Sequence, residues 1–374
     1  MPSRLNGLRK PTKWLASHLA GRGRVIPPKH TPPPGTSHLA QAQAIWPSQK
    51  CHSRNTTFVL AGTWGNLVTV GQCPQWMQGA LCWLGDRRLF DIALPGSHDA
   101  GMSTITGGTV WGNSCSCQNQ GLDIGNQLRA GARYFDIRPV ISVGGFKTGH
   151  YSDTGEPFGW QGANGQSMSD IIDQINDFCR ISAELIVVRL SHALNTDSRP
   201  YKDLTQDEWN RLFSELLRIE HRFVAPVSGS DLTQLKINDF IGSGKAAVVL
   251  VVDPTNISLG SYASQGFYTS SQLCIYDEYS NTNDLNTMTN DQLNKMRQQH
   301  GHYFLLSWTL TQDSKDEVGL GPSIRDLAAK ANPTLYDKFW DACRKDLIPN
   351  VVYVDFFDPL VTNLTIAVNA KATF

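Results

Sequence analysis

The alternation of short apolar segments with amphipathic segments, from about residue 74 to the end, most constrains the fold of this chain. Such alternation over roughly 290 residues is typical of a parallel sheet whose strands are connected by helices. The expected strands cover residues 88–94, 132–140, 145–150, 184–190, 246–252, 273–276, 303–310 and 350–357. The expected helices cover residues 121–131, 168–179, 205–223, 291–299, 323–345 and 361–372.

Two architectures fit this alternation: a doubly wound sheet and a (β/α)8 barrel. The length and the eight strand-containing units favour the barrel. No G-x-G-x-x-G motif follows the first expected strand, which argues against a dinucleotide-binding fold. We therefore predict a distorted TIM (β/α)8 barrel.

The first 72 residues differ from the rest in charge and composition. No Asp or Glu precedes Asp86, whereas nine Lys and Arg do, and five prolines lie between residues 27 and 34. We therefore expect a basic, Pro-containing, disordered extension over residues 1–72 and one catalytic barrel domain over residues 74–374. Neither a secretory leader nor an apolar run of the ~20 residues needed to span a bilayer is evident. We expect a soluble or peripheral membrane protein and leave its compartment open.

Polar residues cluster where the expected strands end. His98 and Asp99 follow the first strand, and His150 ends the strand at residues 145–150. Asp136 and Arg138 are two residues apart in one strand, so they point to the same face. Asp355 lies in the last strand, and the C-terminal ends of barrel strands carry catalytic groups.

This combination of side chains suits phosphodiester cleavage. One histidine can remove a proton from an attacking hydroxyl while the other protonates the leaving oxygen. An aspartate can orient each imidazole, and an arginine can bind the phosphoryl oxygens. No Glu accompanies His98, and Arg138 supplies a cation where a metal site needs an anion. We therefore expect neither a metal nor another cofactor.

Three motifs with their spacing resemble the X domain of phosphatidylinositol-specific phospholipase C, of the metal-independent type that occurs in bacteria and fungi. They are the segments Pro95–Gly101, Gln127–Arg138 and Gly149–His150, and the resemblance extends over about residues 74–374. The resemblance implies a general base at His98, a general acid at His150, and supporting roles for Asp99 toward His150 and Asp355 toward His98. Arg138 would stand where calcium-dependent relatives keep an acidic ligand, and Asp136 would line the same site. The implied first product is a cyclic phosphate, which is hydrolysed more slowly.

The sequence departs from this family where the lipid head group is held. Bacterial relatives carry a lysine after the fourth strand and an arginine after the fifth, but neither is evident at residues 189–192 or 251–253. We take Ser191, His192 and Trp308, with Asp136, as candidate substrate-binding residues. His192 has an alternative interpretation as a structural histidine.

Two other functions stay open. One is a metal-dependent glycerophosphodiesterase-like enzyme, whose usual Glu-x-Asp after the second strand is absent here, and the other is a non-catalytic lipid-binding barrel. For partners, we expect a phospholipid or another phosphodiester substrate and no nucleic acid. The basic extension either contacts an anionic membrane surface, at about 1 kcal/mol per basic residue, or is an arm without a lipid role.

Overall fold

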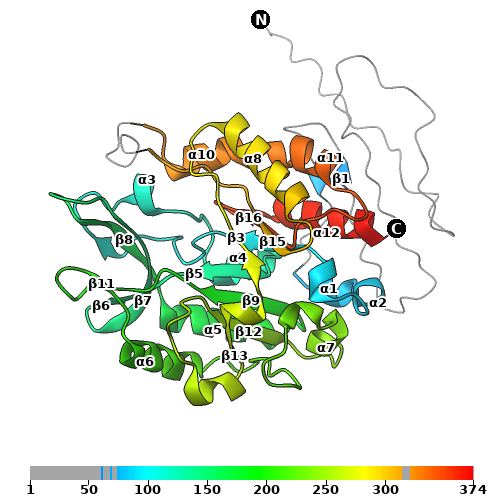
Figure 1. Cartoon of the computed structure of the whole chain (residues 1–374), viewed down its shortest axis with the longest axis horizontal. Helices are drawn as coiled ribbons and strands as arrows, with labels where there is room; N and C mark the ends of the chain where they lie inside the picture. Colours follow the sequence, from blue (N-terminus) through cyan, green and yellow to red (C-terminus); the bar gives the residue numbers. More distant parts are fainter. Residues whose placement is uncertain (1–59, 62–67, 70–73, 314–320, 374) are drawn as a thin grey trace, which may run out of the picture.

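A curled sheet of eight parallel strands forms the centre of the molecule (Figure 1). The computed structural model describes residues 60–61, 68–69, 74–313 and 321–373. The spatial order is β13 (Phe267–Thr269), β12 (Ala247–Val252), β9 (Leu185–Leu190), β5 (Tyr134–Ile137), β3 (Leu94–Ser97), β16 (Val351–Val354), β15 (Tyr303–Ser307) and β14 (Ile275–Tyr276). Every neighbouring pair in this order is parallel. Within the described residues the sheet ends at β13 and β14, so the predicted barrel is confirmed in a distorted, open form.

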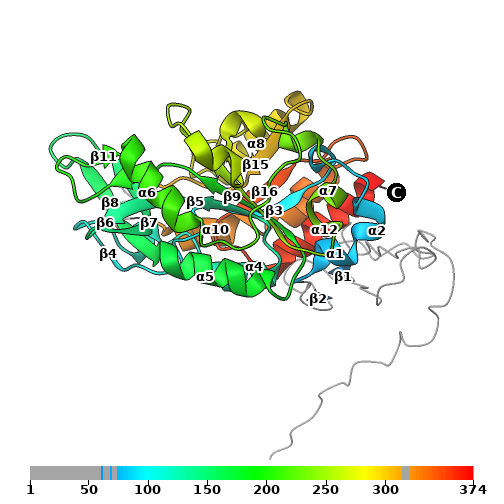
Figure 2. The ribbon, with the colours of Figure 1, turned by 90° about the horizontal axis from the view of Figure 1, so that it is seen from below.

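Helices cover the outer face of this sheet and one end of it. The outer layer contains α4 (Ile124–Ala130), α5 (Met168–Cys179), α6 (Gln206–Leu216), α8 (Leu285–Gln298), α10 (Ile324–Ala331) and α12 (Pro359–Thr373). The end where the strands begin is covered by α1 (Trp76–Gly79), α2 (Leu81–Leu84) and α7 (Ile237–Ile241). Figures 1 and 2 show this small cluster at one end of the molecule, far from the sheet that carries β7.

The alternation of side chains along the strands separates two hydrophobic cores. Leu185 and Val187 of β9 face the barrel interior, whereas Ile186 and Val188 pack against the outer helices. At the C-terminal ends of the strands and just beyond them, the positions that face the barrel interior are occupied by polar residues. These are His98, Asp136, Arg138, Arg189, Ser191, Ser307, Thr309, Tyr353 and Asp355, all of which line one pocket.

A second sheet of six strands stands beside the barrel mouth. Its order is β11 (Lys202–Asp203), β10 (Leu194–Asn195), β6 (Pro139–Ser142), β7 (Gly145–Asp153), β8 (Trp160–Ser167) and β4 (Gly107–Gly108). The expected strand at residues 145–150 belongs to β7 of this sheet, which pairs antiparallel with β6 and β8. The number of barrel strands that we predicted is correct, but one of the strands is not. The prediction included β7, which belongs to the second sheet, and missed the three-residue strand β13.

The first expected strand also begins later than predicted. Residues Leu89–Asp91 form a 3-10 turn, in which the Asp91 carboxylate accepts hydrogen bonds from the Arg88 guanidinium at 2.8 Å. This local ion pair stabilises a turn where the apolar pattern predicted an extended chain. The strand β3 is therefore the Leu-Pro-Gly-Ser segment itself, and His98 follows it directly.

The helices expected at residues 121–131, 168–179 and 361–372 agree with α4, α5 and α12 within about three residues. The helix expected at residues 291–299 is α8, which begins earlier, at Leu285. The helix expected at residues 323–345 is divided into α10, a π-helical turn (Leu335–Phe339) and α11 (Trp340–Ala342). A capping box between Thr205 and Glu208 begins α6, which ends at Leu216 although the sequence predicted a helix to residue 223. Among the described residues no helix is long and apolar enough to cross a membrane. In the predicted extension, β1 (Leu60–Ala61) pairs with β2 (Val68–Thr69). The rest of residues 1–72 lies outside the described ranges, so its expected disorder stays a prediction.

Candidate active site

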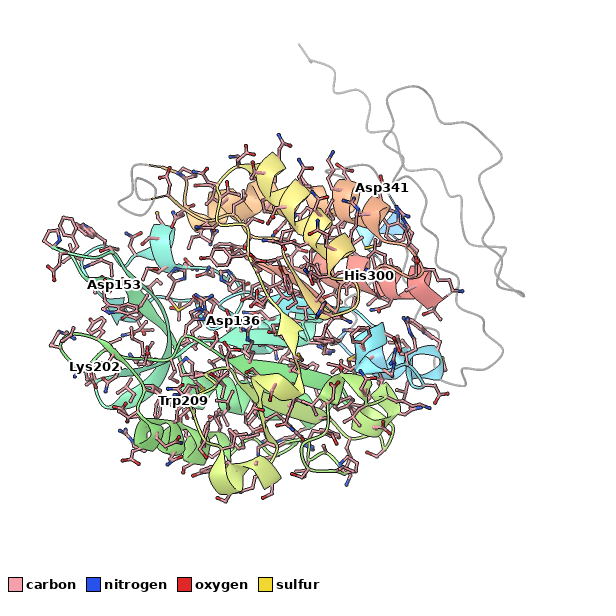
Figure 3. The ribbon with its side chains drawn as sticks, in the orientation of Figure 1. Asp136, Asp153, Lys202, Trp209, His300 and Asp341 are labelled. Carbon is pink, nitrogen blue, oxygen red and sulfur yellow. The ribbon has the colours of Figure 1, made fainter. Side chains whose placement is uncertain are left out.

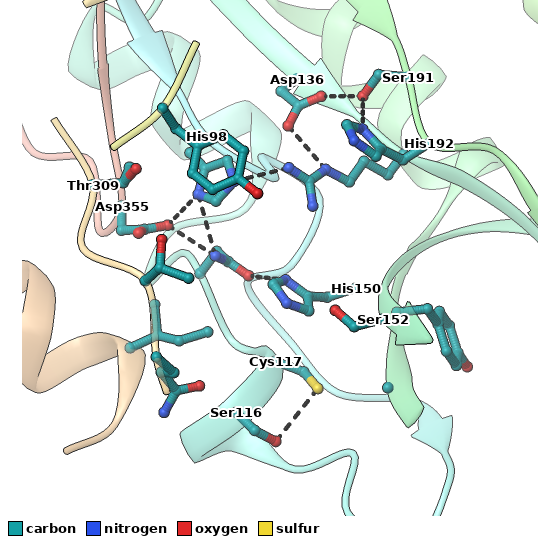
Figure 4. Close-up of a pocket in the computed structure, with 18 of the residues that line it drawn as sticks. His98, Ser116, Cys117, Asp136, His150, Ser152, Ser191, His192, Thr309 and Asp355 are labelled. Atoms are coloured by element: carbon teal, nitrogen blue, oxygen red, sulfur yellow. Dashed lines mark hydrogen bonds and ion pairs between the residues drawn. The ribbon is translucent and has the colours of Figure 1, made fainter. Parts of the chain in front are cut away.

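A pocket of about 680 Å³ opens at the C-terminal mouth of the barrel, between the two sheets. Asp136 lies near the centre of the molecule in this region (Figure 3). Figure 4 shows His98, Asp136, His150 and Asp355 around one space, although they come from β3, β5, β7 and β16 and the loops that follow them. The structure therefore brings together the strand-end residues that the sequence analysis singled out.

His98 is held by a carboxylate on one side and a guanidinium on the other. Its Nδ1 lies 2.8 Å from Asp355 Oδ1, and its Nε2 lies 2.8 Å from Arg138 Nη2. Because arginine only donates, Nε2 accepts and the ring is neutral, with its proton on Nδ1. Burial disfavours the charged ring, but the charge and hydrogen bond of Asp355 outweigh that cost and raise the pKa of His98 above 6.5. The site thus stabilises an imidazolium there once Nε2 receives a proton.

His150 faces the same pocket from the second sheet. Its Nδ1 lies 2.8 Å from Asp99 Oδ2 and 2.9 Å from Asn119 Oδ1, so Nδ1 carries a proton that both oxygens accept. Its Nε2 is the atom left to meet a ligand. The adjacent residues His98 and Asp99 therefore serve different histidine–carboxylate pairs.

The backbone after β3 explains how two neighbouring residues reach different partners. Asp99 has a φ of 41°, a left-handed conformation that Asp tolerates better than most residues. Gly101 lets β7 approach, because a Cβ at this position would lie 2.6 Å from the Cβ of Thr148. Thr148 is two residues before His150 on β7, so this close packing sets the distance between His150 and Asp99.

Arg138 is the centre of the charge network. Its Nε lies 3.0 Å from Asp136 Oδ2, and its Nη1 lies 3.5 Å from Asp99 Oδ2. Burial favours a neutral Asp136, but the charge of Arg138 outweighs it and holds the pKa of this carboxyl well below its usual range. Burial likewise opposes the charge of Arg138, but Asp136 and Asp99 outweigh it and raise its pKa. The guanidinium thus stays charged in the pocket, as binding a phosphate anion requires.

Ser191 and His192 both line the pocket, as expected of substrate-binding candidates. Ser191 Oγ donates to Asp136 Oδ1 at 2.6 Å, and His192 Nδ1 lies 2.9 Å from the same hydroxyl. The positive charge of Arg138 and then burial lower the pKa of His192. Ser191 therefore contacts the site through Asp136, while His192 forms part of its wall in the neutral form.

The structure does not bring Trp308 to the pocket, so this candidate is corrected. Trp308 directly follows β15, and its side chain points away from the barrel interior. It is fully buried in the core between the sheet and the outer helices. Its indole N–H donates to the backbone oxygen of Ala331 at 2.9 Å and lies 3.2 Å from Thr334 Oγ1. The side chains of the neighbouring residues Ser307 and Thr309 point into the barrel and line the pocket instead.

Tyr353, Arg189 and Asn119 also line the pocket, and the sequence analysis did not identify them. Tyr353 Oη donates to Asp136 Oδ2 at 2.6 Å, and its position two residues before Asp355 was a signal for it. Arg189 is two residues after Val187, so its side chain also faces the barrel interior. Its Nη2 lies 2.9 Å from Asp253 Oδ1, and its Nη1 pairs with Asp277. No periodicity identifies the third, the loop residue Asn119.

A divalent metal has no evident set of ligands in this pocket. Residues 74–313 and 321–373 contain no group of three or more His, Cys, Asp or Glu side chains placed to hold a metal ion. The space between Asp99 and Asp136 holds the guanidinium of Arg138. These carboxylates are thus already paired with a cation of the protein's own.

Comparisons with known proteins agree on the fold. No family model matches the sequence, and no curated protein does. A phosphatidylinositol-specific phospholipase C from Listeria monocytogenes is similar with a TM-score of 0.55 and 18% identity, over 79% of this chain and 98% of that one. The chain has the fold of the bacterial phosphatidylinositol-specific phospholipases C.

Two structures from Staphylococcus aureus are similar to the same extent. A variant of the phosphatidylinositol-specific phospholipase C with pentafluoro-Phe gives a TM-score of 0.55 at 16% identity, covering 79% of this chain and 97% of that chain. A structure concerned with membrane binding of the same enzyme gives 0.54 at 16% identity, with the same coverage. The similarity to the phospholipase C fold therefore extends over about four-fifths of this chain and agrees with the fold expected from the motifs.

Proposed function

We propose that this protein is a phosphoric diester hydrolase that cleaves a phosphatidylinositol-like phospholipid by acid–base catalysis with two histidines. The observation that carries the proposal is the pair of histidine–carboxylate contacts, His98 with Asp355 and His150 with Asp99, arranged around Arg138 in one pocket. In each pair the carboxylate engages Nδ1, which leaves Nε2 to exchange protons with a substrate.

In the proposed first step, a head-group hydroxyl next to the phosphoester attacks phosphorus. His98 Nε2 takes the proton of this hydroxyl as the O–P bond forms. The bond from phosphorus to the glyceryl oxygen breaks, and His150 Nε2 gives its proton to that oxygen. The products are a cyclic phosphate and diacylglycerol. In the slower second step water opens the cyclic ester, with the two histidines in exchanged roles.

Arg138 couples phosphate binding to the release of the base. Without substrate its Nη2 donates to the lone pair of His98 Nε2, so the base is blocked. A phosphate anion competes for the guanidinium, because charge-assisted, bidentate hydrogen bonds are the stronger ones. When Arg138 turns to the phosphoryl oxygens, it frees His98 and stabilises the negative charge that develops in the transition state.

The rim of the pocket supports a lipid as the substrate. The rings of Trp111 and Phe158 pack with centroids 4.5 Å apart, and both residues line the pocket. Phe158 is 55% exposed, and Val110, beside Trp111, is 93% exposed. Exposed apolar side chains next to a catalytic pocket suit contact with acyl chains at a membrane surface. The S. aureus relative was itself studied for membrane binding.

Charged residues line the end of the pocket next to β9, where we place the head group. Arg189 lines it with Asp277 and Tyr279, and its guanidinium contacts both Asp253 and Asp277. Carboxylate oxygens accept hydrogen bonds, so this end suits a head group with hydroxyl donors. The mechanism itself requires one hydroxyl adjacent to the phosphoester.

The proposal is tested by assaying phosphatidylinositol vesicles with and without a chelator. We expect activity that survives chelation and falls by about 10²–10⁴-fold in each of His98→Ala and His150→Ala. Activity abolished by chelation and restored by a divalent cation would instead support the glycerophosphodiesterase-like alternative. Lipid binding without turnover, equal in the wild type and both variants, would support a non-catalytic barrel.

The N-terminal extension is a separate question, since most of it lies outside the described residues. We propose contact of its basic residues with an anionic membrane surface as one of two alternatives. Vesicle binding of the chain with and without residues 1–72 distinguishes them. Equal binding of both forms would leave the extension without a lipid role.

A further inference from the structure

Tyr353 touches His98 with its ring and, with its hydroxyl, the carboxylate that holds Arg138. It lies in β16, faces the barrel interior and is 6% exposed. Its Oη donates to Asp136 Oδ2 at 2.6 Å, and the same oxygen accepts from Arg138 Nε at 3.0 Å. Its ring packs against the His98 ring with the two centroids 5.1 Å apart. One side chain thus contacts both sides of the hydrogen bond between His98 and Arg138.

The direction of the hydrogen bond between Tyr353 and Asp136 is fixed by the two groups. Burial, and then the negative charge of Asp136, raise the pKa of Tyr353 well above 10, so its hydroxyl keeps its proton. Arg138 holds the pKa of Asp136 well below its usual range against the opposing effect of burial, so this carboxylate accepts and does not donate. The contact is therefore a charge-assisted hydrogen bond, and its length of 2.6 Å is typical of that class.

The carboxylate of Asp136 is held from two directions across the barrel interior. Its Oδ1 accepts from Ser191 Oγ at 2.6 Å, and Ser191 follows β9, the neighbour of β5 on one side. Its Oδ2 accepts from Tyr353 in β16, which lies on the other side of β5 beyond β3, and from the backbone N–H of Asp99 at 3.2 Å. These contacts fix the orientation in which Asp136 presents Oδ2 to Arg138.

Arg138 must exchange one partner in the proposed reaction, and Asp136 is the partner that it can keep. Without substrate, Nη2 donates to His98 Nε2 while Nε donates to Asp136 Oδ2. If the contact between Nε and Oδ2 persists, the two Nη atoms can turn from the imidazole to a phosphate while the rest of the side chain stays in place. A guanidinium that is already oriented stabilises the developing charge without further reorganisation.

Resting on the proposed function, we propose that Tyr353 is a positioning residue for Arg138. Through Asp136, its hydroxyl fixes the contact about which the guanidinium turns from His98 to the phosphoryl oxygens. Its ring keeps His98 opposite the guanidinium. Tyr353 touches no reacting atom in this scheme.

Tyr353→Phe tests the proposal because it removes the hydroxyl and keeps the ring against His98. We expect kcat on phosphatidylinositol to fall by about tenfold, as for the loss of a hydrogen bond to a charged group. The loss should affect kcat more than KM, because Arg138 is needed most where negative charge develops in the transition state.

A double-mutant cycle shows whether Tyr353 acts through Arg138. Lysine at position 138 lacks the Nε–H and the forked guanidinium, so no such contact remains for Tyr353 to fix. In the Arg138→Lys background, Tyr353→Phe should therefore have little further effect on kcat. An equal loss in both backgrounds would mean that Tyr353 does not act through Arg138 and would overturn the proposal.

Tyr303 offers a matched control inside the same barrel. It is 2% exposed, and its hydroxyl has no hydrogen-bond partner among the described residues. Tyr303→Phe should leave both kcat and KM unchanged. If the hydroxyl of Tyr353 merely stabilised the fold, Tyr353→Phe would lower the melting temperature without lowering kcat relative to KM.

The same proposal is measured without turnover by following the ¹⁵N–¹H NMR signal of Arg138 Nε, which the spectrum of Arg138→Lys assigns. We expect its proton to exchange with water about tenfold faster in Tyr353→Phe than in the wild type or Tyr303→Phe. In the wild type the proton should stay protected when inorganic phosphate is added, because the guanidinium turns about this contact. Unchanged exchange in a folded Tyr353→Phe protein, or loss of protection in the phosphate-bound wild type, overturns the proposal. A wild type without phosphodiesterase activity overturns the proposed function but leaves the exchange measurement intact.

Discussion

Gly101→Ala should separate His150, the proposed general acid, from the Asp99 carboxylate, because no side chain fits between the loop after β3 and strand β7. The added Cβ would lie 2.6 Å from the Cβ of Thr148, whereas ordinary contact begins at 3.4 Å. Rotation of Thr148 cannot move its Cβ, so the strand itself must retreat by about 0.8 Å. Carried to His150, this shift stretches the 2.8 Å contact with Asp99 to about 3.6 Å, which is no longer a hydrogen bond.

We expect kcat of Gly101→Ala to fall by about 10²-fold, since displacements near 1 Å in an active site have that effect. The assay is cleavage of phosphatidylinositol, with the melting temperature as a measure of folding. The double variant Gly101→Ala, Thr148→Gly removes the clash and should recover most of the activity, and Thr148→Gly alone is its control. A folded Gly101→Ala protein with wild-type kcat would refute the role we give to this glycine.

Three further variants test separate parts of the structure. Asp355→Asn should lower kcat by about 10²–10⁴-fold. It should also move the acidic limb of the pH–rate profile to lower pH, because Asp355 raises the pKa of His98 above 6.5 and the base must be neutral to act. An acidic limb that stays in place would contradict this prediction. Glu184 forms an ion pair with Arg133 in which both side chains are fully buried. Glu184→Gln should destabilise the fold by about 3–5 kcal/mol in urea unfolding, because it leaves Arg133 charged and unpaired. A loss below about 1 kcal/mol would contradict this prediction. Phe158→Ser should reduce activity on vesicles several-fold but leave activity on a soluble monomeric phosphodiester unchanged; equal losses on both substrates would argue against membrane contact at the rim.

The barrel and most of its polar mouth could be predicted from the sequence because they follow local rules. The two-residue period of β5 and β16 places Asp136, Arg138 and Asp355 on the interior face. Applied to every strand, the same two-residue period predicts that Arg189 and Tyr353 face the pocket and that Trp308 does not. The error at Trp308 came from its position near a strand end, without regard to its phase.

The remaining features depend on contacts between distant segments and could not be predicted from local patterns. The β7 strand looks like a barrel strand in sequence, but antiparallel pairing with β6 and β8 places it in the second sheet. Asn119 lies in a loop without periodicity, and its place is set by bonds to segments far along the chain. Only the folded chain brings this residue next to both histidines.

The most direct test of the proposed chemistry is the identity of the first phosphorus product. Phosphatidylinositol vesicles treated with the protein in the presence of a chelator would be followed by ³¹P NMR. We predict that a cyclic phosphate appears first and then converts slowly to a phosphomonoester, since the head-group hydroxyl deprotonated by His98 attacks phosphorus. Direct appearance of the monoester, with no cyclic phosphate at any time, would contradict intramolecular attack and with it the central claim.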